Sequence, residues 1–294
     1  MNTLQNKTDT KNNLCCIVIP IYKKELTEHE IISLKQCCNI LGQYPIFFIT
    51  HNKLDCSSYD MICNSMGVSC KYEYFHEYYF HNMLCYSALM ISKSLYEKFQ
   101  NYDYMLIYQL DAYVFKDELE YWCKKGYDYI GAPWLKLNTS KKMPEFYVLP
   151  ITGTAVGNGG FSLRNIKRTI EKHSIILMII SFIRLYESCY NEIVLKSKKN
   201  YFYFIPRLFL RFPLRALESV FLKSNNIVNE DMVWSHLFHK EGNVPPAIEA
   251  MKFSFEMFPE YLYKMNNEKL PFGCHAWFID QNHLFYKEHI KVNL

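Results

Sequence analysis

The chain has 294 residues, half of them hydrophobic, and a formal net charge of +4. A chain of this length can bury most of the surface that its unfolded form exposes, which excludes a small fold dependent on disulfide bonds. A charge this modest does not indicate nucleic acid, and we expect no such partner. Residues 1–13 are a polar N-terminal tail without the apolar stretch of a signal peptide. The most apolar window, residues 175–183, is shorter than the roughly 20 residues of a transmembrane helix.

The eleven cysteines are scattered along the chain, several of them inside apolar runs. They form no CxxC pair and no spacing typical of a zinc site. This pattern favours reduced, buried thiols and a reducing compartment, so we predict a cytoplasmic protein.

Strand-like and helix-like runs alternate between residues 14 and 134. Apolar runs predict strands at residues 14–21, 45–50, 70–75, 104–110 and 127–130. Thr27 and Glu30 have the spacing of a capping box for a helix that reaches Leu41, and further helices are predicted at residues 82–99 and 117–125. The alternation predicts an α/β fold with a mixed, mainly parallel sheet flanked by helices, in a single domain over residues 14–294. Glycine fingerprints of Rossmann dinucleotide sites and P-loops are absent.

Residues 166–229 combine an excess of lysine and arginine with long apolar and aromatic runs. Arg207, Arg211 and Arg215 are four residues apart, so a helix would align them on one face, although Pro213 interrupts a single helix there. We therefore predict a basic helical insertion within the domain. Its segment 201–223 suits an anionic membrane surface or a lipid-linked acceptor, which would bring the protein to the inner face of the membrane. A solvated basic face over an apolar core is the alternative.

Asp111 directly follows the strand predicted at residues 104–110. Ligands of α/β sheets bind at the carboxyl ends of strands, where a carboxylate and phosphate oxygens commonly hold Mg²⁺ or Mn²⁺. From spacing alone, a cap for the next turn explains Asp111 at least as well.

Three further motifs contain residues able to bind or react. The run at residues 157–160 has three glycines, which lets the backbone approach a ligand closely, although an ordinary tight turn has the same composition. Glu230 and Asp231 open a helix-like run, where they are either helix caps or a general base for a hydroxyl group. His275 lies near the C-terminal end and is a candidate metal ligand, although a lone histidine more often has another role.

The order of these motifs resembles that of GT-A-type nucleotide-sugar glycosyltransferases. The resemblance is stronger still to a family of uncharacterised domains described as glycosyltransferase-like. It covers residues 15 to 277 and is carried by the runs 18–23, 108–115, 126–134, 157–164, 229–231, 252–256 and 271–277. It implies a GT-A-like, Rossmann-like fold.

The resemblance also implies a role for individual residues. Asp111 corresponds to the first carboxylate of the metal-binding DxD element, whose third position is Tyr113 here. His275 corresponds to the histidine that completes the site for Mn²⁺ or Mg²⁺. Asp231 corresponds to the catalytic base, with Glu230 beside it. The other implied site residues are donor-binding Pro20, Tyr22, Gln109 and Tyr113, and acceptor-binding Trp134, Gly159 and Gly160.

The function implied by the resemblance is metal-assisted transfer of a sugar from a nucleotide-sugar donor to a hydroxyl acceptor. A hexosyltransferase of polysaccharide biosynthesis fits this description, with a surface glycan or a lipid-linked saccharide as the acceptor. Inversion at the anomeric carbon is expected because a candidate base is present. Two alternatives stay open, a non-catalytic nucleotide-sugar-binding module on the same fold and a nucleotidyltransferase.

Overall fold

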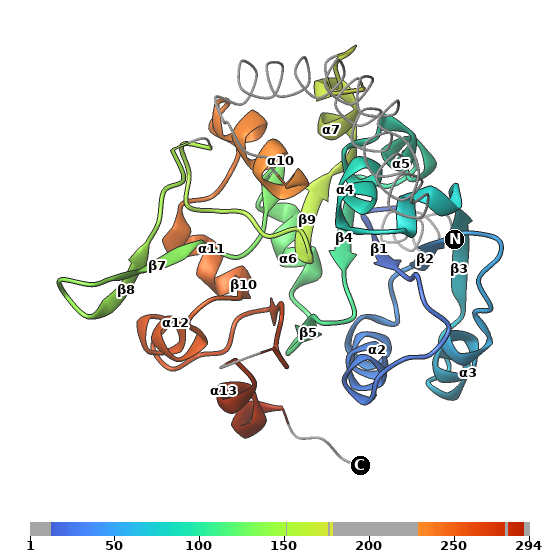
Figure 1. The fold of residues 1–294 in the computed structure, drawn as a ribbon, viewed down its shortest axis with the longest axis horizontal. Coiled ribbons are helices and arrows are strands. Elements are labelled where there is room, and N and C mark those ends of the chain that lie inside the picture. The colour runs from blue at the N-terminus through green and yellow to red at the C-terminus, as the bar shows by residue number, and fades with distance from the viewer. Residues whose placement is uncertain (1–12, 151, 176, 179–228, 280–281, 291–294) are drawn as a thin grey trace, which may run out of the picture.

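The computed structural model describes residues 13–150, 152–175, 177–178, 229–279 and 282–290 (Figure 1). Most of the predicted insertion at 166–229 lies outside these residues, including the whole of segment 201–223. The insertion and its membrane contact therefore stay predictions.

A six-stranded sheet forms the centre of the molecule, with the strand order β3-β2-β1-β4-β9-β6 (Figure 1). Strands β1 to β4 are parallel, whereas β9 is antiparallel to both of its neighbours. Every residue of β1 is buried, as expected for a strand with neighbours on both sides and helices on both faces. The strand bounds are β1 Cys15–Pro20, β2 Ile46–Thr50, β3 Cys70–Tyr74, β4 Tyr104–Tyr108, β6 Tyr129–Ile130 and β9 Phe161–Asn165.

Helices cover both faces of this sheet, and alternate residues of β1 point to the two sides. Ile17 and Ile19 belong to a core cluster with residues of α2 (Glu28–Leu41), α3 (Ser57–Ser65) and α6 (Leu119–Lys124). Cys16 and Val18 belong to a second cluster on the opposite face. That cluster includes residues of α4 (Met83–Ile91), α5 (Lys93–Lys98), α7 (Ile166–Lys172) and α10 (Glu230–His239).

A second, three-stranded sheet has the order β10-β11-β5, with β5 Tyr113–Val114, β10 Ser254–Phe255 and β11 Gly273–Cys274. Its own core cluster includes residues of α12 (Pro259–Met265) and α13 (Asn282–His289). Helix α11 (Ala247–Phe253) leads into β10, and a short 3₁₀ helix, η1 (Glu77–Phe80), precedes α4. A hairpin of β7 (Leu135–Asn138) and β8 (Met143–Phe146) projects from the body (Figure 1).

The predicted α/β class with a mixed, mainly parallel sheet is confirmed, but one predicted helix was wrong. Residues 82–99 form two helices, because Ser92 has extended backbone angles, φ −66° and ψ 137°. The Ser92 hydroxyl donates a hydrogen bond of 2.7 Å to the Leu89 carbonyl. Serine competes in this way for backbone partners, which favours a helix end.

Two findings concern the cysteines and the absence of a predicted transmembrane helix. The ten cysteines in the described part of the chain are all free thiols. Within the same residues, no helix combines the length and the apolar character needed to cross a bilayer.

The capping box predicted at Thr27 is confirmed. The Glu30 amide donates to Thr27 Oγ1 at 3.4 Å, and the Thr27 amide donates to Glu30 Oε2 at 2.7 Å. We expect Thr27→Ala to lower the free energy of unfolding by about 1 kcal/mol, because an orphan amide of α2 loses its acceptor. Denaturant unfolding measures this loss. Thr139→Ala, at an exposed turn position, is the control and should change stability by less than about 0.5 kcal/mol. Equal losses in both variants would contradict the role of the box.

Candidate active site

The predicted site residues gather at one edge of the central sheet. Parallel strands β1 and β4 end on this edge, at Pro20 and Tyr108. Antiparallel β9 begins there, because Phe161 pairs with Tyr108 and the Gln109 amide donates to the Gly160 carbonyl at 2.8 Å. The topology therefore brings the residues that follow β4 next to the glycine-rich turn that precedes β9.

The small sheet places His275 against Asp111. His275 follows β11, and its amide donates to the Phe255 carbonyl of β10 at 3.0 Å. The imidazole Nε2 lies 3.1 Å from Asp111 Oδ1 and 3.2 Å from Gln109 Oε1, while Nδ1 lies 3.0 Å from Glu256 Oε1. The ring is therefore held on both sides by oxygen atoms.

The two carboxylates next to His275 determine its charge. Burial alone would lower the pKa of His275, but attraction to Asp111 and Glu256 is stronger and raises the pKa to about 10. Burial alone would raise the pKa of Asp111, but attraction to His275 is stronger and leaves this pKa below its usual value. In the metal-free protein, an imidazolium ion thus lies between two carboxylates at neutral pH.

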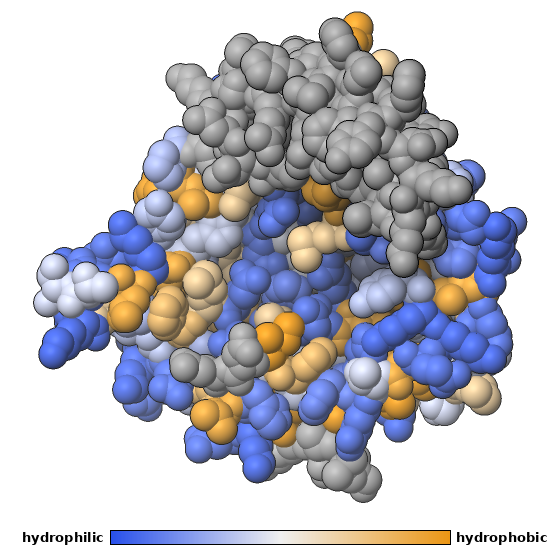
Figure 2. All heavy atoms as spheres, in the orientation of Figure 1, coloured by the Kyte–Doolittle hydropathy of each residue, from blue (hydrophilic) through white to orange (hydrophobic). Residues whose placement is uncertain are grey.

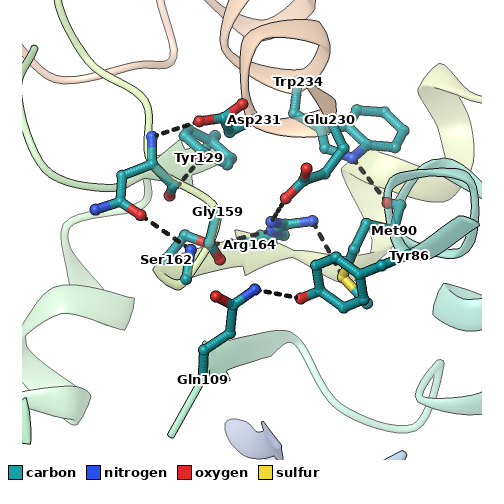
Figure 3. A network of polar contacts seen from close by, with 12 residues as sticks. Tyr86, Met90, Gln109, Tyr129, Gly159, Ser162, Arg164, Glu230, Asp231 and Trp234 are labelled. Atoms are coloured by element: carbon teal, nitrogen blue, oxygen red, sulfur yellow. Dashed lines mark hydrogen bonds and ion pairs between the residues drawn. The ribbon is translucent and has the colours of Figure 1, made fainter. Parts of the chain in front are cut away.

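Gln109 and Tyr113, each two residues from Asp111, lie in different surroundings. Gln109 Nε2 donates to the Tyr86 hydroxyl at 2.9 Å (Figure 3), and the amide oxygen lies 3.2 Å from His275 Nε2. Tyr113 is buried in the core of the small sheet, with its ring centre 5.9 Å from that of Trp277. Gln109 is therefore the residue that the structure brings beside Asp111, and Tyr113 is not.

A cavity of about 590 Å³ opens beside Gln109 and Asp111, a volume typical of small-molecule sites. The ends of β1 and β4 and the η1–α4 segment supply its wall. The predicted donor-binding residues Pro20, Tyr22, Gln109 and Asp111 all line it, whereas Tyr113 and Trp134 do not. Figure 2 shows a hollow near the centre of the face drawn, with hydrophilic residues on its visible floor.

The glycine-rich turn joins this cavity to a second group of acids. A β-carbon at Gly160 would lie 2.0 Å from His275 Nε2, and one at Gly159 would lie 2.0 Å from Glu230 Oε1. Neither position accommodates a side chain without movement of its neighbour. The ring of predicted acceptor-binding Trp134 packs against the start of this turn, where a β-carbon at Gly157 would meet it at 1.7 Å.

Asp231 lies on the other side of this turn, in the first turn of α10 (Figure 3). Its Oδ2 accepts the Asn158 amide at 3.0 Å and its Oδ1 accepts the Met232 amide at 2.8 Å. Burial and then repulsion from Glu230 raise the pKa of Asp231 to about 7. The Trp234 indole donates to the Met90 carbonyl at 3.0 Å and so fixes α10 on α4.

Sequence reasoning missed three residues of this site. Glu256 orients His275, Tyr86 orients Gln109, and buried Arg164 pairs with Glu230 at 3.4 Å. Glu256 and Arg164 fall within the runs 252–256 and 157–164 that carry the family resemblance, which was the available signal. No sequence signal pointed to Tyr86, because its contact with Gln109 depends on how α4 packs in the fold.

The donor atoms around His275 fit a divalent cation. Adjacent ligands of an octahedral ion with bonds of about 2.1 Å lie ~3 Å apart, close to the separation between Asp111 Oδ1 and His275 Nε2. Glu256 on the other ring nitrogen is the usual partner of a metal-binding histidine. No group of three or more His, Cys, Asp or Glu side chains suited to a metal occurs among the described residues. A cation would therefore need oxygen atoms from its ligand or from water.

The chain was compared with protein-family models, curated proteins and solved structures. A family model described as "Protein of unknown function (DUF5672)" matches residues 69–275. A search of curated proteins found no match.

Solved structures of glycosyltransferases are similar in fold. An active-site mutant of LgtC aligns with a TM-score of 0.50 and 14% identity, over 88% of this chain and 86% of that chain. The galactosyltransferase LgtC with donor and acceptor sugar analogues aligns with a TM-score of 0.49 and 14% identity, over 88% of this chain and 86% of that chain. The glycosyltransferase GlyE of Streptococcus pneumoniae TIGR4 aligns with a TM-score of 0.48 and 13% identity, over 96% of this chain and 61% of that chain. At such identities the likeness to the LgtC mutant shows the fold, so the GT-A-like prediction is confirmed.

The raised pKa of His275 predicts a pH dependence of stability in metal-free protein. Its contribution should be fully present below the unfolded pKa of about 6.5 and lost as pH rises toward 10. We expect His275→Gln to cost most stability near pH 6 and progressively less up to pH 10, measured by denaturant unfolding with a chelator present. His239→Gln, on an exposed histidine of α10, controls for the loss of a histidine. A stability loss at His275 that does not vary with pH would contradict the ion-pair geometry.

Proposed function

This chain belongs to the DUF5672 family of proteins of unknown function, and we propose that it is a glycosyltransferase that uses a nucleotide-sugar donor. The observation that carries the proposal is the arrangement of two polar groups around one glycine-rich turn. Asp111 and His275 lie on one side, next to a cavity of suitable volume, and Asp231 lies on the other. A transferase needs a leaving-group site and a base near the same reacting carbon, and this arrangement supplies both.

The donor would occupy the cavity at the ends of β1 and β4. Pro20 and Tyr22 would contact the nucleoside, and the diphosphate would reach Gln109 and Asp111. The metal-binding element is then Gln109-Leu110-Asp111, with an amide in place of the first carboxylate. This assignment differs from the alignment of Asp111 with the first acid and Tyr113 with the third position, and it rests on the buried location of Tyr113.

A divalent cation, Mn²⁺ or Mg²⁺, suits the charge of this site. Asp111, Glu230, Asp231 and Glu256 supply four acids, while Arg164 and His275 supply two cations. An excess of acid repels a diphosphate, so a cation that arrives with the donor would favour binding. When bound to Asp111 and His275, it would neutralise charge on the leaving diphosphate. His275 must first lose its Nε2 proton, while Glu256 would accept a hydrogen bond from the proton that stays on Nδ1.

Asp231 would act as the base for the acceptor hydroxyl. Each of its oxygens accepts one backbone amide and retains a second lone pair for the hydroxyl proton. The acceptor oxygen would attack the anomeric carbon from the face opposite the diphosphate, which inverts the configuration. The acceptor would be a glycan or a lipid-linked saccharide bound near Trp134, Gly159 and Gly160. A product with the donor's own anomeric configuration, assigned by NMR, would contradict inversion.

Nucleoside diphosphate binding tests the Gln109-Leu110-Asp111 assignment. In the presence of Mn²⁺, we expect Asp111→Ala to weaken calorimetric affinity by at least about tenfold, because a charge-assisted metal contact is lost. Gln109→Ala should weaken it less but clearly, since an amide is a weaker ligand. Tyr113→Phe is the matched control and should leave affinity unchanged. Weaker binding by Tyr113→Phe together with normal binding by Gln109→Ala would restore the alternative alignment.

Turnover tests the base. We expect Asp231→Asn to retain donor binding but to lose transfer by about 100-fold or more, the usual contribution of general-base catalysis. Because a base acts only when deprotonated, kcat in the parent protein should rise through about pH 7, the pKa of Asp231. The rise should be absent from the residual activity of Asp231→Asn. Near-normal turnover of this variant would refute the assignment.

One alternative keeps specific support. A single carboxylate in the metal-binding element would also suit a module that binds a nucleotide-sugar without catalysis. A screen of nucleotide-sugars for transfer or hydrolysis separates the two functions. A nucleotidyltransferase would instead require a nucleoside triphosphate and release pyrophosphate.

A further inference from the structure

Arg164 is a fully buried cation next to the proposed base. Its Nε donates to Ser162 Oγ at 3.2 Å, and its Nη2 lies 3.4 Å from Glu230 Oε1 (Figure 3). Its Nη1 donates to the Tyr96 hydroxyl at 2.9 Å. The guanidinium carbon is 5.7 Å from the centre of the Tyr129 ring. Arginine stays charged in such an environment, so the surroundings must supply a negative partner.

Glu230 is that partner, and little space surrounds it. Its side chain is 8% exposed, and the absence of a β-carbon at Gly159 makes room for Oε1. The Arg164 guanidinium is therefore the counterion of Glu230, within the same helical turn as Asp231.

Besides burial, charged groups on several neighbouring elements shift the pKa of Asp231. Glu230 precedes it on α10, Glu256 follows β10, and both raise its pKa, whereas Arg164 on β9 lowers it. The Tyr129 hydroxyl donates to the Asn158 carbonyl and lies on the same side of the turn. The Met232 amide, at the N-terminus of α10, favours the charged carboxylate. Of the two acids, Glu230 is the one adjacent to Asp231 in sequence, and its cation is Arg164.

We propose that the Arg164–Glu230 ion pair is a positioning element for catalysis, which holds an ion-paired carboxylate beside Asp231 and so sets how readily Asp231 accepts a proton. The inference rests on the proposed role of Asp231 as base. In the reaction, the acceptor O–H bond breaks and its proton moves to Asp231. The acceptor oxygen forms a bond to the anomeric carbon, and the bond from that carbon to the diphosphate breaks, with its electron pair leaving on the diphosphate.

A purely structural role for the pair makes a different prediction. If Arg164 only fills the core and fixes the glycine-rich turn, its loss lowers stability and activity at every pH alike. If the pair sets the charge beside Asp231, its members act in opposite directions. Loss of Arg164 hinders ionisation of Asp231, and loss of the Glu230 charge promotes it.

Three variants separate these roles, namely Arg164→Met, Glu230→Gln and the double substitution. The titration midpoint of Asp231 is measured by NMR of ¹³C-labelled aspartate carboxyl groups, assigned with Asp231→Asn. We expect Arg164→Met to raise the midpoint by about 1 unit or more and Glu230→Gln to lower it by a similar amount. The double variant should return toward the parent, since both charges are absent. The midpoints of the pH profiles of kcat should shift in the same order.

The outcomes distinguish this inference from the proposed function. Equal midpoints in all three variants, with transfer still dependent on Asp231, would overturn the role of the ion pair and leave the base assignment intact. The expected order of midpoints together with normal turnover of Asp231→Asn would overturn the base assignment instead. Arg164→Met could fail to fold because Glu230 is left unpaired. In that case Glu230→Gln and the double variant still separate the two roles, because a charge role predicts different Asp231 midpoints for them and a structural role predicts equal midpoints. The double variant is then expected to fold, because neither buried charge remains.

Discussion

The absence of side chains at Gly159 and Gly160 is the constraint on which the site depends. Each glycine leaves a space that a functional group fills, His275 at Gly160 and Glu230 at Gly159. A two-residue stretch of backbone thereby separates the group around Asp111 from the group around Asp231. Any side chain at either position would push one of these groups away from the shared turn. Close approach of backbone and side chain is thus the condition for a single site.

The topology of the sheets explains why this turn lies where it does. Strand β9 runs against β4, so the residue before it meets the residue after β4, and the Gln109 amide bonds to Gly160. The short ladder between β10 and β11 brings Glu256 and His275 side by side just beyond its end. Helix α10 brings Glu230 and Asp231 from the opposite face of the turn. Segments far apart in the chain therefore reach one point with little freedom.

The sequence predicted the central strands and the capping box at Thr27, because each depends on local patterns. It placed Asp111 directly after a strand, whereas β4 ends at Tyr108 and Asp111 lies in the turn that follows. It did not predict β5, β10 and β11, since a two-residue strand has no periodicity to detect. The positions of Glu256 and His275 depend on those strands. The family resemblance assigned Tyr113 to the third position of the metal-binding element and Gln109 only to donor binding. Only the turn at residues 109–112, closed by the Ala112 amide on the Gln109 carbonyl, decides that Tyr113 enters the core.

The distribution of charge explains why Asp231 differs from its neighbours. His275 lies between Asp111 and Glu256, and Arg164 lies against Glu230, so each of these acids has a cation in contact. No ion pair of Asp231 occurs in the part of the chain that the structure describes, and its two oxygens accept backbone amides instead. Amides hold a carboxylate in place without fixing its protonation as firmly as a cation does. Burial and then repulsion from Glu230 place the pKa of Asp231, the acid with no cation in contact, near neutrality, which is the property that proton transfer requires.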